Sequence, residues 1–247
     1  HAPSGGWGNA TCHAATVSTH KWRRARQPLD RCPLAPEDKQ PGSLSEEKLL
    51  VHDPREHLAR IARLVFDRRL TDASGGNLSL REEDRVYMTP ARAGSKQQWQ
   101  VSAEEIVVLD LEGNLVDGPD RRTREWQFHL GIYRNFARAG GVIHGQAGHF
   151  MAFVAAGKPM PTVLEHTRKF GTIGMAEFAP AHSGDLATKV IEALAPQANE
   201  LEKHAIATMV PQHGIIVVGR DLDDAFDTID RLETNAQALL LGKLLEK

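Results

Sequence analysis

The segment 204–219, HAIATMVPQHGIIVVG, constrains the fold most, because it holds two β-type runs separated by only a few residues. Pro211 lacks an amide hydrogen and Gly214 permits a sharp turn, so both residues interrupt the run. The pattern predicts two strands joined by a short connection. A further β-branched run, Gly141-Val142-Ile143, leads directly to a His-Gly pair, and a second His-Gly pair lies at 213–214.

Helical periodicity surrounds these strands. Asp53 is a candidate cap and Pro54 suits the first turn of a helix over 53–70. Paired glycines in 71–90 predict the tight turn of a β-hairpin, and 104–118 predicts two short strands around a Glu-Gly-Asn turn. The remaining predicted helices are 124–139, 149–156, 183–194 with Ser183 as cap, and a long helix from 221 with Asp221 as cap. This mixture of helices with mostly antiparallel strands predicts a single α/β sandwich-like domain.

Composition excludes several functional classes. The formal net charge is −2, which gives no reason to expect a nucleic-acid or anionic-membrane partner. No apolar run approaches the roughly 20 residues that span a bilayer. Cys12 and Cys32 have no metal-ligand spacing, so a reducing cytoplasm is expected. Residues 1–45 lack helical and strand periodicity and are expected to form an irregular tail before a domain over 46–247.

His144 and His213 are the first candidates for chemistry. Each is associated with a β-branched run and each precedes a glycine, so two such histidines facing one cleft would form a metal site on a rigid frame. The alternative for either one is an ordinary histidine satisfied by hydrogen bonds. Glu125 begins a predicted helix with His129 one turn further, and near a metal its carboxylate can act as a general acid or base. The alternative is that glutamate stands here only because the helix dipole favours a negative charge in the first turn.

The loop Ala-Ser-Gly-Gly-Asn at 73–77 is a candidate anion site. Its backbone amides and the side-chain amide of Asn77 can face an anion, as compact turns often do. As a motif it is weak, because such turns are common in β-rich proteins.

The order of these motifs resembles the class II aldolase/adducin family from about residue 54 to 244. The sequence runs SGGNLSLR, YMTP, EWQFHLGIYR, GGVIHGQ, SGDLA and PQHGIIVVGRDLDDAF. The resemblance implies an αβα sandwich around a mainly antiparallel sheet, a homotetramer, and a divalent ion, usually zinc, bound by three histidines. It assigns His144 and His213 as metal ligands, Glu125 to proton transfer, and Asn77 to the anion-binding loop.

The chain departs from the family pattern at the metal site. Gln146 stands where the second histidine of a His-x-His motif is expected. An amide oxygen binds zinc more weakly than imidazole does, so Gln146, His149 or a water is left to complete the ligands. At the anion pocket Thr123 is present, but Arg124 and Arg92 replace small residues, and two guanidinium groups can clamp a carboxylate or a differently placed phosphate. The alternative is that both arginines are ordinary solvated surface residues.

The resemblance therefore predicts a cytoplasmic, metal-dependent lyase of carbohydrate metabolism. Its substrate would be a small anionic hydroxy-carbonyl compound, cleaved at a C–C bond through a metal-stabilised enediolate. Decarboxylation of a hydroxy acid is the alternative reaction. A non-catalytic, adducin-like interaction module is the alternative of a different class.

Overall fold

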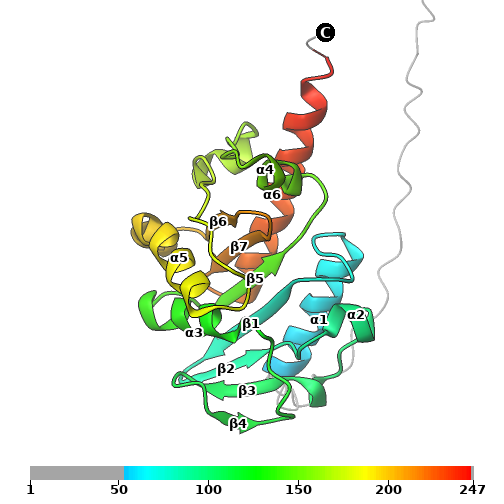
Figure 1. The fold of residues 1–247 in the computed structure, drawn as a ribbon, viewed down its shortest axis with the longest axis vertical. Coiled ribbons are helices and arrows are strands. Elements are labelled where there is room, and N and C mark those ends of the chain that lie inside the picture. Colours follow the sequence, from blue (N-terminus) through cyan, green and yellow to red (C-terminus); the bar gives the residue numbers. More distant parts are fainter. Residues whose placement is uncertain (1–52, 246–247) are drawn as a thin grey trace, which may run out of the picture. The chain divides into compact units, whose positions relative to one another are not determined.

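The computed structural model describes residues 53–245, which contain one seven-stranded sheet and its covering helices (Figure 1). The expected tail over 1–45, with Cys12 and Cys32, lies outside the described residues. The strands are β1 (Asn77–Glu82), β2 (Arg85–Met88), β3 (Val107–Asp110), β4 (Leu115–Asp117), β5 (Gly141–Gly145), β6 (Ile206–Val210) and β7 (Gly214–Gly219). The α-helices are α1 (Pro54–Asp67), α2 (Ala93–Gln97), α3 (Trp126–Asn135), α4 (Phe150–Ala156), α5 (Gly184–Leu194) and α6 (Leu222–Gly242). Three short 3-10 helices are η1 (Ala103–Glu105), η2 (Glu165–Phe170) and η3 (Ala195–Glu202).

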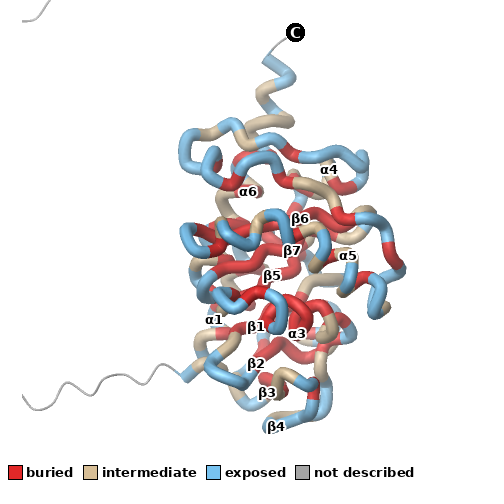
Figure 2. Tube along the Cα trace, turned by 90° about the vertical axis from the view of Figure 1, so that its left-hand side faces the viewer, coloured by how far each residue is buried: buried red, intermediate tan, exposed pale blue. Residues whose placement is uncertain are grey.

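The sheet has the order β4-β3-β2-β1-β5-β7-β6, and all its neighbouring strands pair antiparallel. Both of its faces are covered. Along β7, Ile215 and Val217 belong to the core with α1, α4 and α6, whereas Ile216 and Val218 belong to the core with α3 and α5. Figure 2 shows the central strands β1, β5 and β7 as buried. This arrangement confirms the predicted αβα sandwich.

The register of the central strands brings the first functional residues together. His144 on β5 lies opposite Asn77 on β1 and opposite Ile216 on β7. His144 is therefore inside the sheet, one residue before the end of its strand. His213 lies in the turn between β6 and β7, directly before Gly214. Because β7 neighbours β5, this turn lies beside His144.

The helix starts follow the predicted capping residues. Asp53, Ser183 and Asp221 each accept a hydrogen bond from a backbone amide in the first turn of α1, α5 and α6, respectively. The predicted hairpin exists as β1 and β2, but the predicted position of its turn is wrong. The chain reverses at Glu83 and Asp84, whereas the paired glycines precede β1. Glu83 has φ of 51°, a left-handed conformation that the sequence did not signal.

Helix α6 packs so closely on β5 that a side chain does not fit between them. A Cβ atom placed on Gly141 would lie 2.5 Å from the Cα atom of Leu222 and 2.6 Å from the carbonyl carbon of Asp221. Both are backbone atoms, so the start of α6 would have to move.

In the part of the chain that the structure describes, no helix is long and apolar enough to cross a bilayer.

We predict that Gly141→Ala lowers the free energy of unfolding by about 1–3 kcal/mol, because overpacking a core displaces backbone. Gly174→Ala is the matched control, since a Cβ atom there meets no atom within 4 Å. Urea unfolding of both variants measures the difference. Equal stability of the two variants would show that α6 does not depend on the close contact with β5.

Candidate active site

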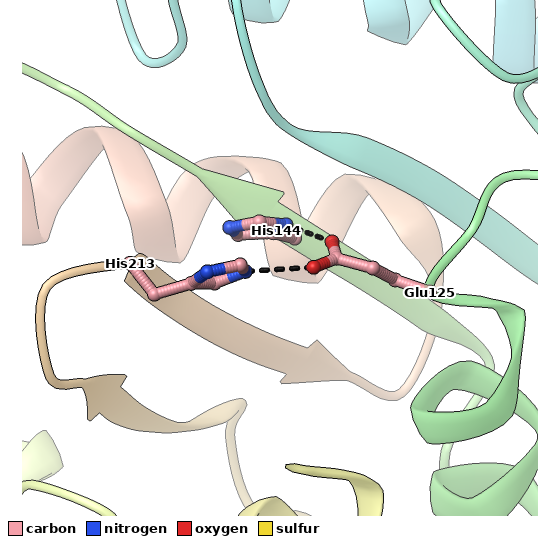
Figure 3. A group of neighbouring side chains, drawn as sticks. All are labelled: Glu125, His144 and His213. Atoms are coloured by element: carbon pink, nitrogen blue, oxygen red, sulfur yellow. Dashed lines mark hydrogen bonds and ion pairs between the residues drawn. The ribbon is translucent and has the colours of Figure 1, made fainter. Parts of the chain in front are cut away.

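Three separate stretches of the chain bring one carboxylate and two imidazoles together (Figure 3). Glu125 is the residue before α3, His144 lies on β5, and His213 lies in the β6–β7 turn. His144 Nδ1 is 2.9 Å from Glu125 Oε2, and His213 Nε2 is 2.8 Å from Glu125 Oε1. The two imidazole rings are stacked, with centroids 4.7 Å apart and planes 11° from parallel. The sequence-predicted residues 125, 144 and 213 therefore meet at one point.

The Glu125 carboxylate is charged although it is buried. Burial by itself raises the pKa of this carboxyl, but the imidazoles of His144 and His213 outweigh that effect and hold the pKa well below its usual range. A buried carboxylate without such partners would be costly. The position of the two histidines is therefore part of what allows Glu125 to remain ionised.

A chain of buried hydrogen bonds also leads to Glu125. Asn77 Nδ2 donates to Glu125 Oε2 at 2.8 Å, and Asn77 Oδ1 lies 2.6 Å from His129 Nε2. His129 Nδ1 lies 2.6 Å from Ser79 Oγ, which is 2.8 Å from the hydroxyl of Tyr133. Since the Asn77 amide nitrogen serves Glu125, its oxygen accepts from His129 Nε2, and Nδ1 accepts from Ser79.

The protonation states agree with this direction. Burial lowers the pKa of His129 to about 3, so its ring is neutral and has one donor and one acceptor. Burial raises the pKa of the Tyr133 hydroxyl, which keeps the proton that it donates to Ser79. Every link thus has one donor, and the chain ends on the carboxylate of Glu125. Asn77 contacts Glu125 directly and also lines the cavity described below.

The residues present fit a divalent ion. Glu125 Oε1, His144 Nε2 and His213 Nε2 are buried atoms without a hydrogen-bond partner among the described residues. His213 Nε2 is close to Glu125 Oε1 but out of line for a hydrogen bond. One ligand atom from each of the three residues lies within 4.8 Å of the others. Two imidazoles and one carboxylate form a set that holds zinc in enzymes and leaves a position open.

The glycine after His213 makes room for His144. A Cβ atom on Gly214 would lie 2.9 Å from His144 Nε2 and 2.5 Å from the carbonyl oxygen of Gly145. Only glycine leaves that space. This contact gives a physical reason for the His-Gly pair at 213–214.

The site opens into a cavity of about 250 Å³. Asp72 Oδ1 accepts from the amides of Ser74 and Gly75 and so shapes the loop at its edge. Gly76 has φ of 90°, and a Cβ atom there would lie 2.4 Å from Thr71 Oγ1. The cavity is also lined by the residues that the sequence predicted for the site, namely Asn77, Arg92, Thr123, Arg124, Glu125, His144, Gln146 and His213.

Arg92 and Arg124 are both exposed, and Thr123 is buried. The cavity is thus lined by two guanidinium groups and one carboxylate, Glu125. The guanidinium groups of Arg92 and Arg124 supply positive charge for an anionic ligand, whereas the imidazoles are already paired with the Glu125 carboxylate.

Gln146 and His149 differ in their contacts. Gln146 lines the cavity, but its Nε2 donates to the backbone carbonyl of His213 at 2.8 Å. A Cβ atom on Gly75 would lie 2.1 Å from Gln146 Oε1, so the amide oxygen faces the glycine loop. His149 is not among the lining residues, and its Nδ1 lies 2.6 Å from Glu233 Oε1. Gln146 thus connects the histidine turn to the anion loop.

His182 is a cavity residue that the sequence did not single out. Its Nδ1 lies 3.5 Å from Glu125 Oε1, and its side chain is 36% exposed. Its only local signal is its place directly before Ser183, the cap of α5. That signal says nothing about a contact with residue 125, which is far away in the sequence.

Comparisons with known proteins found a family model, curated relatives and solved structures that are similar to this chain. A family model described as Class II Aldolase and Adducin N-terminal domain matches residues 56–240. An L-fuculose phosphate aldolase of Methanococcus maripaludis is 30% identical over 179 residues, covering 72% of this chain and 91% of the relative. A 3-oxo-tetronate 4-phosphate decarboxylase of Haemophilus influenzae is 28% identical over 187 residues, covering 74% of this chain and 85% of the relative.

A solved structure gives the same fold. The L-fuculose-1-phosphate aldolase of Thermus thermophilus superposes with a TM-score of 0.65 at 20% identity, covering 78% of this chain and 96% of that one. At this identity the likeness bears on the fold, and it supports the αβα arrangement of the described residues.

The buried His129 predicts a specific pH dependence of stability. Its pKa is about 3 in the folded protein and about 6.5 in the unfolded chain, so the unfolded state binds more protons between these values. The free energy of unfolding therefore falls as the pH drops below about 6.5, by up to about 1.4 kcal/mol per pH unit from this residue. His129→Gln keeps a donor and an acceptor and should show a shallower slope in urea unfolding between pH 7 and 5. Identical slopes would mean that His129 titrates normally in the folded protein.

Proposed function

The chain belongs to the class II aldolase and adducin family and is an aldolase-type lyase within it, and from this premise we propose its reaction. It cleaves a C–C bond of a small anionic hydroxy-carbonyl compound with the help of a divalent ion. One observation carries the proposal: Glu125, His144 and His213 converge in the same cavity that Arg92 and Arg124 line. The cavity therefore combines the group of Glu125, His144 and His213 with a cationic rim, formed by Arg92 and Arg124, that can bind the substrate anion.

His144 and His213 are the residues that would hold the ion, and Gln146 is the third residue assigned by the family pattern. Zinc suits the two imidazoles. When bound, the ion supplies a Lewis acid that stabilises the negative charge developing on the carbonyl oxygen as the C–C bond breaks. Zinc as the ion, the homotetramer and a place in carbohydrate metabolism belong to this same proposal.

Glu125 moves the proton in this proposal. It is ionised, it is 4% exposed, and the hydrogen bond from Asn77 fixes its orientation. A hydroxyl group of a bound substrate can give its proton to the carboxylate as the C–C bond breaks and the hydroxyl becomes a carbonyl, and the carboxylate can return a proton to the carbon that keeps the electron pair. The chain from Tyr133 to Asn77 keeps the carboxylate in place while this proton moves.

Arg92 and Arg124 bind the anionic group of the substrate. A second depression of about 370 Å³ adjoins them and is lined as well by Lys96 and Arg121. Four cations on one rim attract a phosphate or carboxylate and orient the substrate toward Glu125. Thr123, whose Oγ1 accepts weakly from the amide of Glu125 at 3.4 Å, links this rim to the carboxylate.

Decarboxylation is a second candidate, favoured by the two arginines. A guanidinium group binds a carboxylate in two parallel hydrogen bonds, and loss of CO₂ leaves the same kind of carbanion next to a carbonyl as aldol cleavage does. The Haemophilus influenzae relative is named as a decarboxylase of a phosphorylated oxo acid. Incubation with phosphorylated ketoses and with phosphorylated 3-oxo acids, followed by measurement of released aldehyde and CO₂, separates the two reactions.

Glu125→Gln should lower turnover by on the order of a hundredfold or more, because the amide cannot accept the substrate proton. The hydrogen bond from Asn77 can be kept by the amide oxygen, so the variant should remain folded. Steady-state kinetics with circular dichroism as the fold control gives the result. Turnover equal to that of the unmodified protein would remove Glu125 from the proton transfer.

Arg124→Ala and Arg92→Ala should each raise KM for a phosphorylated substrate far more than for its unphosphorylated counterpart, since only the former needs the cationic rim. Arg138→Ala is the matched control, because Arg138 is paired with Glu202 and does not line the cavity. If both substrates lose affinity equally, the two arginines do not bind the anion.

A further inference from the structure

A third imidazole faces the Glu125 carboxylate from the loop before α5. His182 Nδ1 lies 3.5 Å from Glu125 Oε1, and this oxygen is buried and has no hydrogen-bond partner among the described residues. His182 lines the same cavity as His144 and His213. Imidazole nitrogens from three parts of the chain therefore surround one carboxylate.

The 3.5 Å between His182 Nδ1 and Glu125 Oε1 can be compared with the spacing of two ligand atoms on one zinc ion. Two ligand atoms of a tetrahedral zinc lie about 3.3–3.6 Å apart, given bonds of about 2.0–2.2 Å. His182 Nδ1 and Glu125 Oε1 have this spacing, which is long for a hydrogen bond. His182 is not in the group of Glu125, His144 and His213 whose ligand atoms lie within 4.8 Å of one another, so its ring must turn toward the ion, and a side chain that is 36% exposed has room to do so.

The backbone holds His182 in an unusual conformation. Its φ is 64°, a left-handed value that is unfavourable for a non-glycine residue. The following residue fixes this geometry, because Ser183 Oγ donates to the carbonyl of Pro180 and accepts from the amide of Leu186.

The other candidates for a third nitrogen ligand are engaged elsewhere. The nitrogen of Gln146 donates to the backbone of His213, and His149 contacts Glu233 on α6. Neither therefore offers a free nitrogen at Glu125.

We propose that His182 is the third imidazole ligand of the divalent ion in this chain, in the role that the family gives to the residue two after His144. The inference rests on the proposed function, since it needs the ion site at His144 and His213. With a third neutral nitrogen, the site prefers zinc to a hard ion such as magnesium. The loop before α5 then closes one side of the cavity.

The test is a zinc competition titration of the purified full chain against a chelator of known affinity. His182→Ala removes the ligand, and His182→Gly removes it while suiting the left-handed backbone. His166→Ala is the matched control, since His166 is exposed in η2 and does not line the cavity. We expect both His182 variants to bind zinc at least about a hundredfold more weakly, beyond the usual 10–100-fold effect of outer partners. The control should be unchanged.

Two further measurements make the outcome decisive. Cobalt substituted for zinc should show a changed visible spectrum in the His182 variants, because a nitrogen ligand is lost. The apo His182→Gly variant should be at least as stable to heat as the unmodified protein, since glycine relieves the strained φ. Weaker zinc together with both of these results supports His182 as a ligand.

Other results overturn it. Zinc affinity of the His182 variants within a few-fold of the unmodified protein, or an unchanged cobalt spectrum, excludes His182 from the ligands. His144→Ala separates this failure from that of the proposed function. If His144→Ala loses zinc while the His182 variants keep it, the ion site stands and the inference about His182 is wrong. If His144→Ala also keeps zinc, the ion site of the proposed function is itself wrong.

Discussion

The rest of the site depends on one buried charge, the carboxylate of Glu125. A buried carboxylate is stable only where it is paired and hydrogen-bonded. Here the imidazoles of His144 and His213 and the amide of Asn77 contact it. Asn77 and His144 lie on strands and His213 lies in a turn, so the cost of burying one charge is offset by contacts from three separate parts of the chain. An error in the position of any one of them would remove one of the three contacts that stabilise the buried carboxylate.

The fold meets this requirement through its central strands. β1, β5 and β7 are neighbours in the sheet, which places Asn77 opposite His144 and the turn with His213 beside both. Helix α3 begins directly after Glu125, which contacts His144 near the end of β5. Close packing of α6 on β5 and of Gly214 on His144 fixes the imidazoles further. A sheet covered on both faces thus serves as a rigid frame, and the reactive groups lie at one end of its central strands.

Local patterns in the sequence predicted what depends on local chemistry. Asp53, Ser183 and Asp221 were identified as caps because a capping side chain bonds within its own first turn. Glu125, His144 and His213 followed from motif order and from a family resemblance that the comparisons confirm. The turn at Glu83 was misplaced because paired glycines are an ambiguous signal for a turn. The contacts of Gln146 with His213 and of His182 with Glu125 join distant residues, and no local pattern encodes them.

The central claim is that Glu125, His144 and His213 surround one divalent ion. The most direct measurement is anomalous X-ray diffraction at the zinc edge from crystals of the protein grown with zinc. The account predicts one strong peak within about 2.0–2.2 Å of imidazole nitrogens from His144 and His213. A well-ordered crystal in which these two rings face each other without such a peak, or in which zinc binds only elsewhere, would contradict it.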